Sequence, residues 1–280
     1  MPRTIRHRFA LTLQAAPPPQ DPGPRGADAP APPPKDMSFT GVPVAVSGQQ
    51  AVEVAPPLQG QGWIVGNGCC DPITVHRGAL LAIDGTVYAA QRFAIDFIQL
   101  NPAGQLYTGN PADVASFPFF GTPVHAVADG TVVRVLDGQP EQTPGKLPEG
   151  QTPQTGDGNY VVLDIGNGRF AFYAHLQPGS FKVKVGDRVR TGDVLGLLGN
   201  TGNTDTPHLH FHVMDGPSPL LSNGLPFVFT SFTGRGAITD EAAINPPFPP
   251  QAATIAPDAA TLAGPHTKQL PLNLEVVDFP

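Results

Sequence analysis

The chain has 280 residues, of which 32 are glycine, 35 are proline and only 14% are charged. Many turn-forming residues, few charges and little helical periodicity favour an all-β protein. The formal net charge of −7 argues against a nucleic-acid partner, because phosphate binding requires a basic face. No apolar run reaches the roughly 18–20 residues that a membrane-spanning helix needs, so we expect no transmembrane segment.

Proline-rich composition at both ends divides the chain into four expected parts. Residues 16–34 hold too few apolar side chains to offset the entropy of ordering them, which predicts a disordered linker. The chain begins with basic residues and a short apolar stretch, which is a weak match to a signal peptide. The expected parts are a disordered leader with a candidate signal region over 1–36, a short β segment over 37–72, one β domain over 73–235, and a proline-rich tail over 236–280 with a final docking strand near 270–279.

Strand-like runs separated by glycine turns fill the middle of the chain. In chain order, apolar alternation surrounds turns at Asp84–Gly85, Asp129–Gly130 and 166–168, which predicts the hairpins of a sandwich or barrel. Two long polar loops, 101–120 and 137–157, separate these runs, and loops of this length usually form the rim or lid of a site. Core packing is the expected use of the aromatic residues Trp63, Phe117, Phe119 and Phe120.

Two adjacent cysteines, Cys69 and Cys70, follow the first strand-like segment. A vicinal pair closes only a small ring and is a poor structural staple. The pair also lacks a second pair at zinc-finger spacing. We therefore expect two plain, small residues.

Three histidines alternate in the stretch "TDTPHLHFHVMD" over 204–215. Side chains two apart on a strand share a face, so His208, His210 and His212 should point the same way. Three imidazoles on one face, after a glycine-rich loop, form a candidate wall for metal binding or proton transfer. A fourth histidine, His175, ends the strand in "FYAHLQPGS".

These motifs carry a family resemblance. The segments "YAHL" and "VKVGDRVRTGDVLGLLGNTGNTDTPHLHFHV", preceded by "GTPVHAVADGTVVRV", resemble the lysostaphin-like zinc endopeptidases of peptidase family M23. That family cleaves peptide cross-links in bacterial cell-wall peptidoglycan. The resemblance spans about 90–215 and implies a duplicated hybrid motif fold, in which a mostly antiparallel sheet forms a groove with Zn²⁺ on its floor. It also implies stem or cross-bridge peptides as the substrate and a secreted or periplasmic location.

The resemblance also implies roles for individual residues. His210 and Asp96 would be zinc ligands, and His175 and His208 would activate the water and stabilise the tetrahedral intermediate. The sequence departs from the family pattern at Arg92, four residues before Asp96, where the family has its first histidine ligand. A guanidinium offers no lone pair and stays protonated, so Arg92 cannot bind zinc.

Two hypotheses follow from this departure. In the first, another side chain replaces the missing ligand; His76 is the leading candidate and His212 the next. Arg92 and His212 would then act around the ligands, by orienting Asp96, stabilising the oxyanion or supplying charge. In the second, Arg92 pairs with Asp96, no metal binds, and the domain is an inactive cell-wall-binding or regulatory module. We favour the first, because an inactive module has little need for all three of the remaining family histidines.

Overall fold

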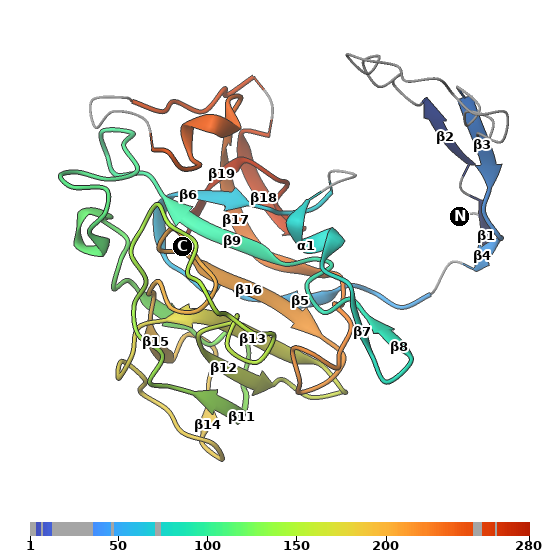
Figure 1. Cartoon of the computed structure of the whole chain (residues 1–280), viewed down its shortest axis with the longest axis horizontal. Coiled ribbons are helices and arrows are strands. Elements are labelled where there is room, and N and C mark those ends of the chain that lie inside the picture. The colour runs from blue at the N-terminus through green and yellow to red at the C-terminus, as the bar shows by residue number, and fades with distance from the viewer. Residues whose placement is uncertain are drawn as a thin grey trace, which may run out of the picture. The chain divides into compact units, whose positions relative to one another are not determined.

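A computed structural model describes residues 4–6, 8–12, 36–45, 48–70, 74–248, 254–260 and 262–280 (Figure 1). The linker predicted over 16–34 lies outside these residues. The chain divides into two compact units, Met1–Gln50 and Ala51–Pro280. No helix within the described ranges is long and apolar enough to cross a membrane.

The described residues of the first unit form four short strands. β1 (Thr4–Ile5) pairs with β4 (Val44–Ala45), and β2 (Arg8–Thr12) pairs with β3 (Asp36–Thr40), both antiparallel. Both pairs include residues of the leader predicted over 1–36, and that part of the expected division remains a prediction.

The second unit is built on one eleven-stranded sheet, which confirms the predicted all-β, mostly antiparallel class. Among the strands of the described residues, only β5 and β17 pair in parallel. The strands in spatial order are β14 (Arg188–Val189), β11 (Gly130–Leu136), β12 (Asn159–Asp164), β13 (Phe170–Leu176), β16 (Leu209–Met214), β9 (Ile95–Gln99), β6 (Gly60–Gly66), β19 (Glu275–Phe279), β17 (Phe227–Ala237) and β18 (Gly264–Gln269), with β5 (Val52–Val54) beside β17.

Smaller elements surround this sheet. They are the hairpin of β7 (Leu81–Ile83) and β8 (Thr86–Tyr88), the pair of β10 (Pro123–His125) and β15 (Val194–Leu197), the helix α1 (Val75–Gly78), and the 3₁₀ helices Val114–Ser116 and Glu241–Ala243. The turn predicted at Asp84–Gly85 joins β7 and β8, as expected. The hairpin expected around Asp129–Gly130 does not form, because β10 pairs with β15 while β11 pairs with β12 and β14.

Strands from both ends of the expected four-part division join the same sheet. β5 and β6 come from the segment before residue 73, and β19 comes from the tail, where it pairs with β6 and β17. A strand thus lies where the sequence predicted a docking strand near 270–279. The four domain boundaries themselves remain a prediction.

One face of the sheet packs on the main core, and the opposite face carries the histidines beside a second, smaller apolar cluster of Val162, Phe172, Ala174 and Met214. Trp63, Phe117 and Phe119 are fully buried, as predicted, and Phe120 packs half-buried against the same core. The loop 101–120 packs inward through its phenylalanines rather than forming a rim. On β16, Leu209 and Phe211 belong to this core while the histidines alternate with them onto the opposite face. The sheet is thus a rigid floor for those histidines.

The cysteine pair differs from the expectation. Cys69 and Cys70 are joined by a disulfide, with Cys69 buried and Cys70 exposed. The two cysteines therefore form a disulfide with each other rather than remaining free thiols.

Candidate metal centre

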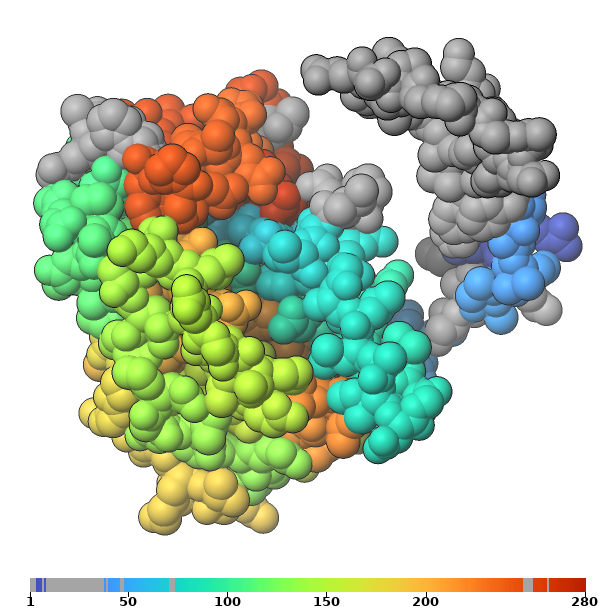
Figure 2. Space-filling model, viewed as in Figure 1, coloured from blue at the N-terminus to red at the C-terminus, as the bar shows by residue number. Residues whose placement is uncertain are grey.

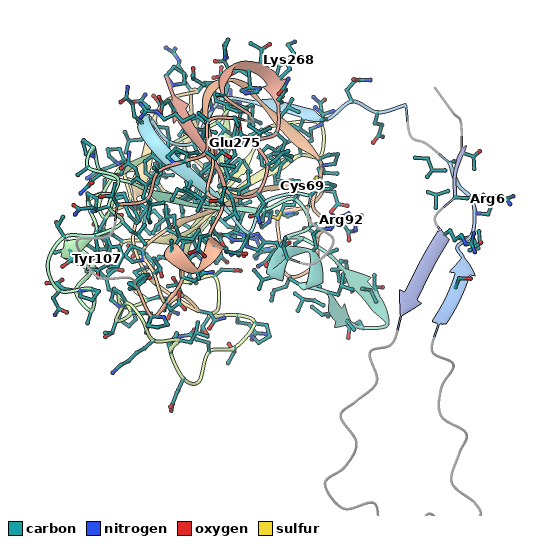
Figure 3. All side chains as sticks on the ribbon, turned by 90° about the horizontal axis from the view of Figure 1, so that it is seen from above. Arg6, Cys69, Arg92, Tyr107, Lys268 and Glu275 are labelled. Atoms are coloured by element: carbon teal, nitrogen blue, oxygen red, sulfur yellow. A yellow bond between two sulfur atoms is a disulfide. The ribbon has the colours of Figure 1, made fainter. Side chains whose placement is uncertain are left out.

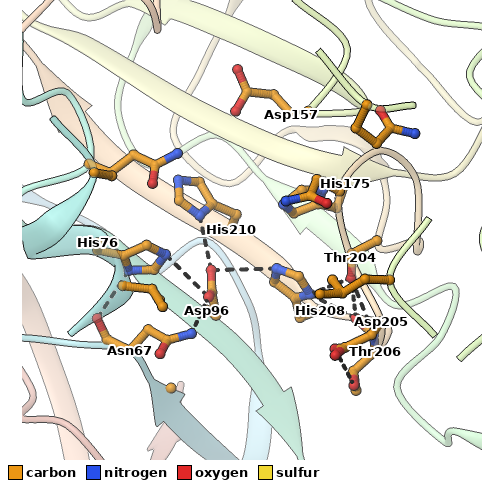
Figure 4. Close-up of a pocket in the computed structure, with 18 of the residues that line it drawn as sticks. Asn67, His76, Asp96, Asp157, His175, Thr204, Asp205, Thr206, His208 and His210 are labelled. Carbon is orange, nitrogen blue, oxygen red and sulfur yellow. Dashed lines mark hydrogen bonds and ion pairs between the residues drawn. The ribbon is translucent and has the colours of Figure 1, made fainter. Parts of the chain in front are cut away.

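Three side chains from separate elements converge on one point (Figure 4). Asp96 on β9 lies directly across from His210 on β16, and His76 on α1 reaches the same carboxylate. Asp96 Oδ1 lies 2.9 Å from His210 Nδ1, and Asp96 Oδ2 lies 3.2 Å from His76 Nε2. The three ligand atoms all lie within 4.8 Å of one another. Zinc ligands at bonds of about 2.0–2.2 Å lie about 3–4 Å apart, so small side-chain shifts suffice to enclose an ion.

The local sequence explains how His76 arrives there. Thr74 caps α1 by accepting a hydrogen bond from Arg77 N through its side chain, and the single helical turn directs His76 inward, where it is 5% exposed. Opposite Asp96, β6 has Gly66, where a Cβ would lie 3.0 Å from the Asp96 carbonyl oxygen. A small residue there keeps the two strands in contact beneath the site.

The hydrogen bonds of the imidazoles fix which nitrogen carries the proton. His76 Nδ1 lies 3.0 Å from Asn67 O and 3.1 Å from Ala94 O. Carbonyl oxygens only accept, so His76 Nδ1 is the donor and its Nε2 presents a lone pair towards Asp96 when the ring is neutral. A lone pair facing a carboxylate is repulsive unless a proton or a cation lies between them. This donor set therefore fits a divalent cation such as zinc.

The remaining ligand candidate is supported from behind. His210 Nε2 lies 3.0 Å from His212 Nδ1, and His212 is fully buried against the ring of Phe172. With a metal at His210 Nδ1, the ring proton is on Nε2 and donates to His212. His212 thus lies behind His210 and is outside the group of three converging ligand atoms.

Electrostatics keep Asp96 anionic and keep the rings of His175, His210 and His212 neutral. Burial would raise the pKa of Asp96, but the positive potentials of His76 and His208 and hydrogen bonds outweigh it and hold this pKa well below its usual value. Burial lowers the pKa of His210 to about 4. Burial also holds the pKa of His175 and of His212 well below the usual value.

His76 behaves differently from the other rings. Burial alone would lower the pKa of His76, but the charge and hydrogen bond of Asp96 raise it above the ordinary value. A cation bound in place of the proton between His76 Nε2 and Asp96 would be attracted by the same carboxylate charge.

Two more of the histidines selected from the sequence face the same centre. The ring centroids of His175 and His208 are 4.5 Å apart, and His208 Nε2 lies 3.5 Å from Asp96 Oδ1. His175 Nδ1 donates to Thr201 O at 2.6 Å, and His208 Nδ1 donates to Thr206 O at 2.7 Å. Both rings therefore present an unprotonated Nε2 when neutral.

Arg92 is not part of the site, which corrects both roles that the sequence suggested for it. β9 begins only at Ile95, and the chain turns over 90–93, with Ala94 N bonded to Gln91 O. Arg92 is therefore not on the same strand face as Asp96; its side chain is exposed, with the guanidinium 5.7 Å from the Phe93 ring centroid (Figure 3). No Arg92–Asp96 ion pair occurs within the described part of the chain.

A pocket of about 1050 Å³ opens above the centre, and Figure 2 shows the hollow between the loop around 150 and the segment around 80. The loop 137–157 lines it through its second half, as expected for a rim. Among the described residues, the lining contains the carboxylates of Asp96, Asp157, Asp205 and Glu241 but no lysine or arginine. The sequence analysis did not select Asn67 or Asp157, because neither stands in a recognisable motif.

Comparison with known proteins identifies the domain. Residues 112–221 match the model of peptidase family M23. The chain carries an M23 peptidase domain. The match contains His175, His208 and His210 but begins after His76 and Asp96.

Relatives of this M23 domain include two named endopeptidases. The glycyl-glycine endopeptidase ALE-1 of Staphylococcus capitis is 33% identical over 138 residues, which is 49% of this chain and 33% of the relative. The peptidoglycan DD-endopeptidase ShyA of Vibrio cholerae is 36% identical over 94 residues, 34% of this chain and 18% of the relative. The matched region therefore spans a third or less of the length of these relatives.

Solved structures include the catalytic domain of lysostaphin from Staphylococcus simulans. It shares 25% identity, with 59% of this chain and 88% of that domain covered, at a TM-score of 0.32. The fold described above rests on the strand pairing of the chain itself.

The raised pKa of the Asp157 carboxyl group should make the stability of the M23 domain depend on pH. Burial raises its pKa from 3.8 to about 7, so the folded state holds this proton more tightly than the unfolded state. The free energy of unfolding therefore falls as the pH rises from about 4 to 7. We expect Asp157→Asn to stabilise the protein by about 2–4 kcal/mol at pH 8 and by progressively less towards pH 4.

Thermal and urea unfolding at several pH values measures this difference. Glu241→Gln changes an exposed carboxylate on the same pocket and should alter stability by less than about 0.5 kcal/mol. A gain for Asp157→Asn that did not depend on pH would contradict the assignment.

Proposed function

We propose that this M23 domain is a zinc-dependent endopeptidase that hydrolyses peptide cross-links of bacterial cell-wall peptidoglycan outside the cytoplasm. The observation that carries the proposal is the convergence of His76, Asp96 and His210, with two further imidazoles beside them. The endopeptidase names of its relatives support the reaction class. The pocket above the centre leaves room for an extended peptide.

His76, Asp96 and His210 would hold zinc as three protein ligands, which leaves a position open for water or substrate. Bound zinc would supply a Lewis acid that acidifies water and polarises the scissile carbonyl. Asp96 contributes the negative charge, and burial keeps His210 neutral at pH 7. The two ligand rings are held from behind, His76 by carbonyl oxygens and His210 by His212.

The proton transfers of this reaction fall to His175 and His208. Each ring has its Nδ1 proton fixed on a carbonyl oxygen, so its Nε2 can accept a proton from the attacking water. The same nitrogen can then donate that proton to the leaving amine or hydrogen-bond the developing oxyanion. Both rings are held by backbone atoms of the loop before β16, which keeps them oriented without substrate.

The proposal is tested by metal content and cleavage together. Protein purified without chelator should contain about one zinc per chain, and mass spectrometry should detect cleavage of purified muropeptide dimers. His210→Ala should lose both the metal and the cleavage. Zinc-loaded protein that binds these peptides without cutting them would support the alternative, an inactive cell-wall-binding module.

A further inference from the structure

Asn67 connects two of the candidate zinc ligands that belong to different elements. It follows β6 directly and lines the pocket beside His76 and Asp96 (Figure 4). Its side-chain Nδ2 donates to Asp96 Oδ2 at 2.8 Å. Its carbonyl oxygen accepts from His76 Nδ1 at 3.0 Å.

We propose that Asn67 is a positioning residue that fixes Asp96 and His76 for zinc binding. The side chain leaves Asp96 Oδ2 facing His76, while Asp96 Oδ1 faces His210 and His208. The carbonyl oxygen selects the His76 tautomer whose Nε2 is free to bind a metal. The inference takes zinc as the ion from the proposed function, whereas the two hydrogen bonds are present without any ion.

The two hydrogen bonds of Asn67 explain how His76 can serve as a ligand from a position outside the family pattern. Arg92 stands where the family pattern places a histidine on the same segment as Asp96, whereas His76 comes from a separate four-residue helix. Two ligands on independent elements need a common support to keep their spacing. Asn67 provides that support from the end of a third element, because it directly follows β6, which is itself paired with β9.

The backbone of Asn67 suits this residue type. Its φ is +52°, a left-handed conformation that asparagine tolerates better than most residues with a side chain. Its loop is held from both sides by Asn273, because Gly68 N donates to Asn273 Oδ1 at 3.0 Å and Asn273 N donates to Cys69 O at 2.9 Å. Glycine accepts this φ without steric cost, and it would keep the carbonyl contact while removing the side-chain amide.

Asn67→Gly therefore separates positioning from folding. Its matched control is Asn167→Gly, an exposed asparagine with a φ of +56° in the turn between β12 and β13. The dissociation constant for zinc is measured by competition with a chromophoric chelator, and thermal unfolding is measured on the metal-free proteins. We expect zinc binding to weaken about 10–100-fold in Asn67→Gly and to stay within about twofold in Asn167→Gly.

A zinc dissociation constant in Asn67→Gly within twofold of the wild type would overturn the positioning role. Wild-type protein that binds zinc but cleaves no peptide would contradict the proposed hydrolysis alone, since the affinity comparison would still stand. If the wild type bound no zinc, crystal structures of the metal-free wild type and of Asn67→Gly would test the positioning role. A changed Asp96 rotamer in Asn67→Gly would support it, and an unchanged Asp96 rotamer would overturn it.

Discussion

His76→Ala is expected to weaken zinc binding by more than about a hundredfold. Loss of a residue that only supports a ligand weakens metal binding by at most about a hundredfold, and loss of a ligand should cost more. The substitution leaves Asp96 and His210 as the remaining converging ligands, one fewer than the three protein ligands of a catalytic zinc site. Cleavage of muropeptide dimers should fall in parallel. The measurements are zinc per chain by inductively coupled plasma mass spectrometry and the zinc dissociation constant.

Arg92 supplies the matched control for this experiment. Its side chain is exposed in a turn, so Arg92→Ala should leave zinc affinity within about twofold. Adding Arg92→His to His76→Ala should not restore binding, because position 92 does not share a strand face with Asp96. Restored zinc binding in the double variant, or full zinc content in His76→Ala, would contradict the assignment of His76. Unfolding of the metal-free proteins separates loss of the ligand from loss of the fold.

His208→Ala is expected to reduce kcat about 10²–10⁴-fold while leaving the zinc dissociation constant within about threefold, because in the proposed mechanism the ring transfers protons and does not bind the metal. His175→Ala should have the same effect, since the two rings are 4.5 Å apart and equally oriented by carbonyl oxygens. Loss of zinc in either variant would instead make that ring a ligand. Steady-state kinetics on a defined muropeptide dimer, with zinc content measured in the same preparations, distinguishes these outcomes.

His125 provides a control of the same residue type. Its Nδ1 donates to Gly192 O at 2.8 Å, and it does not line the pocket. His125→Ala should therefore change neither zinc binding nor kcat. Equal losses in His125→Ala and His208→Ala would indicate a general structural effect rather than proton transfer.

The sequence by itself determined the all-β class, the M23 resemblance and the strand that carries the histidines. Alternation in "HLHFH" directs Leu209 and Phe211 into the core and His208, His210 and His212 to the other face, since side-chain direction in a strand depends only on local geometry. The family resemblance also selected His175 and Asp96. The sequence did not determine whether His76 or His212 replaces the missing ligand, because both were compatible with the local patterns.

Only the tertiary structure decided which side chains meet. His76 and Asp96 are 20 residues apart and Asp96 and His210 are 114 apart, so their convergence depends on strand order and on the placement of α1. The turn over 90–93 removed Arg92 from the site because it ends the alternation that the sequence suggested. Asn67 and Asp157 stand in no motif, and their environments arise from packing between distant segments. Strand periodicity depends on neighbouring residues and can be seen in the sequence. Ligand geometry and burial depend on contacts between distant segments and cannot.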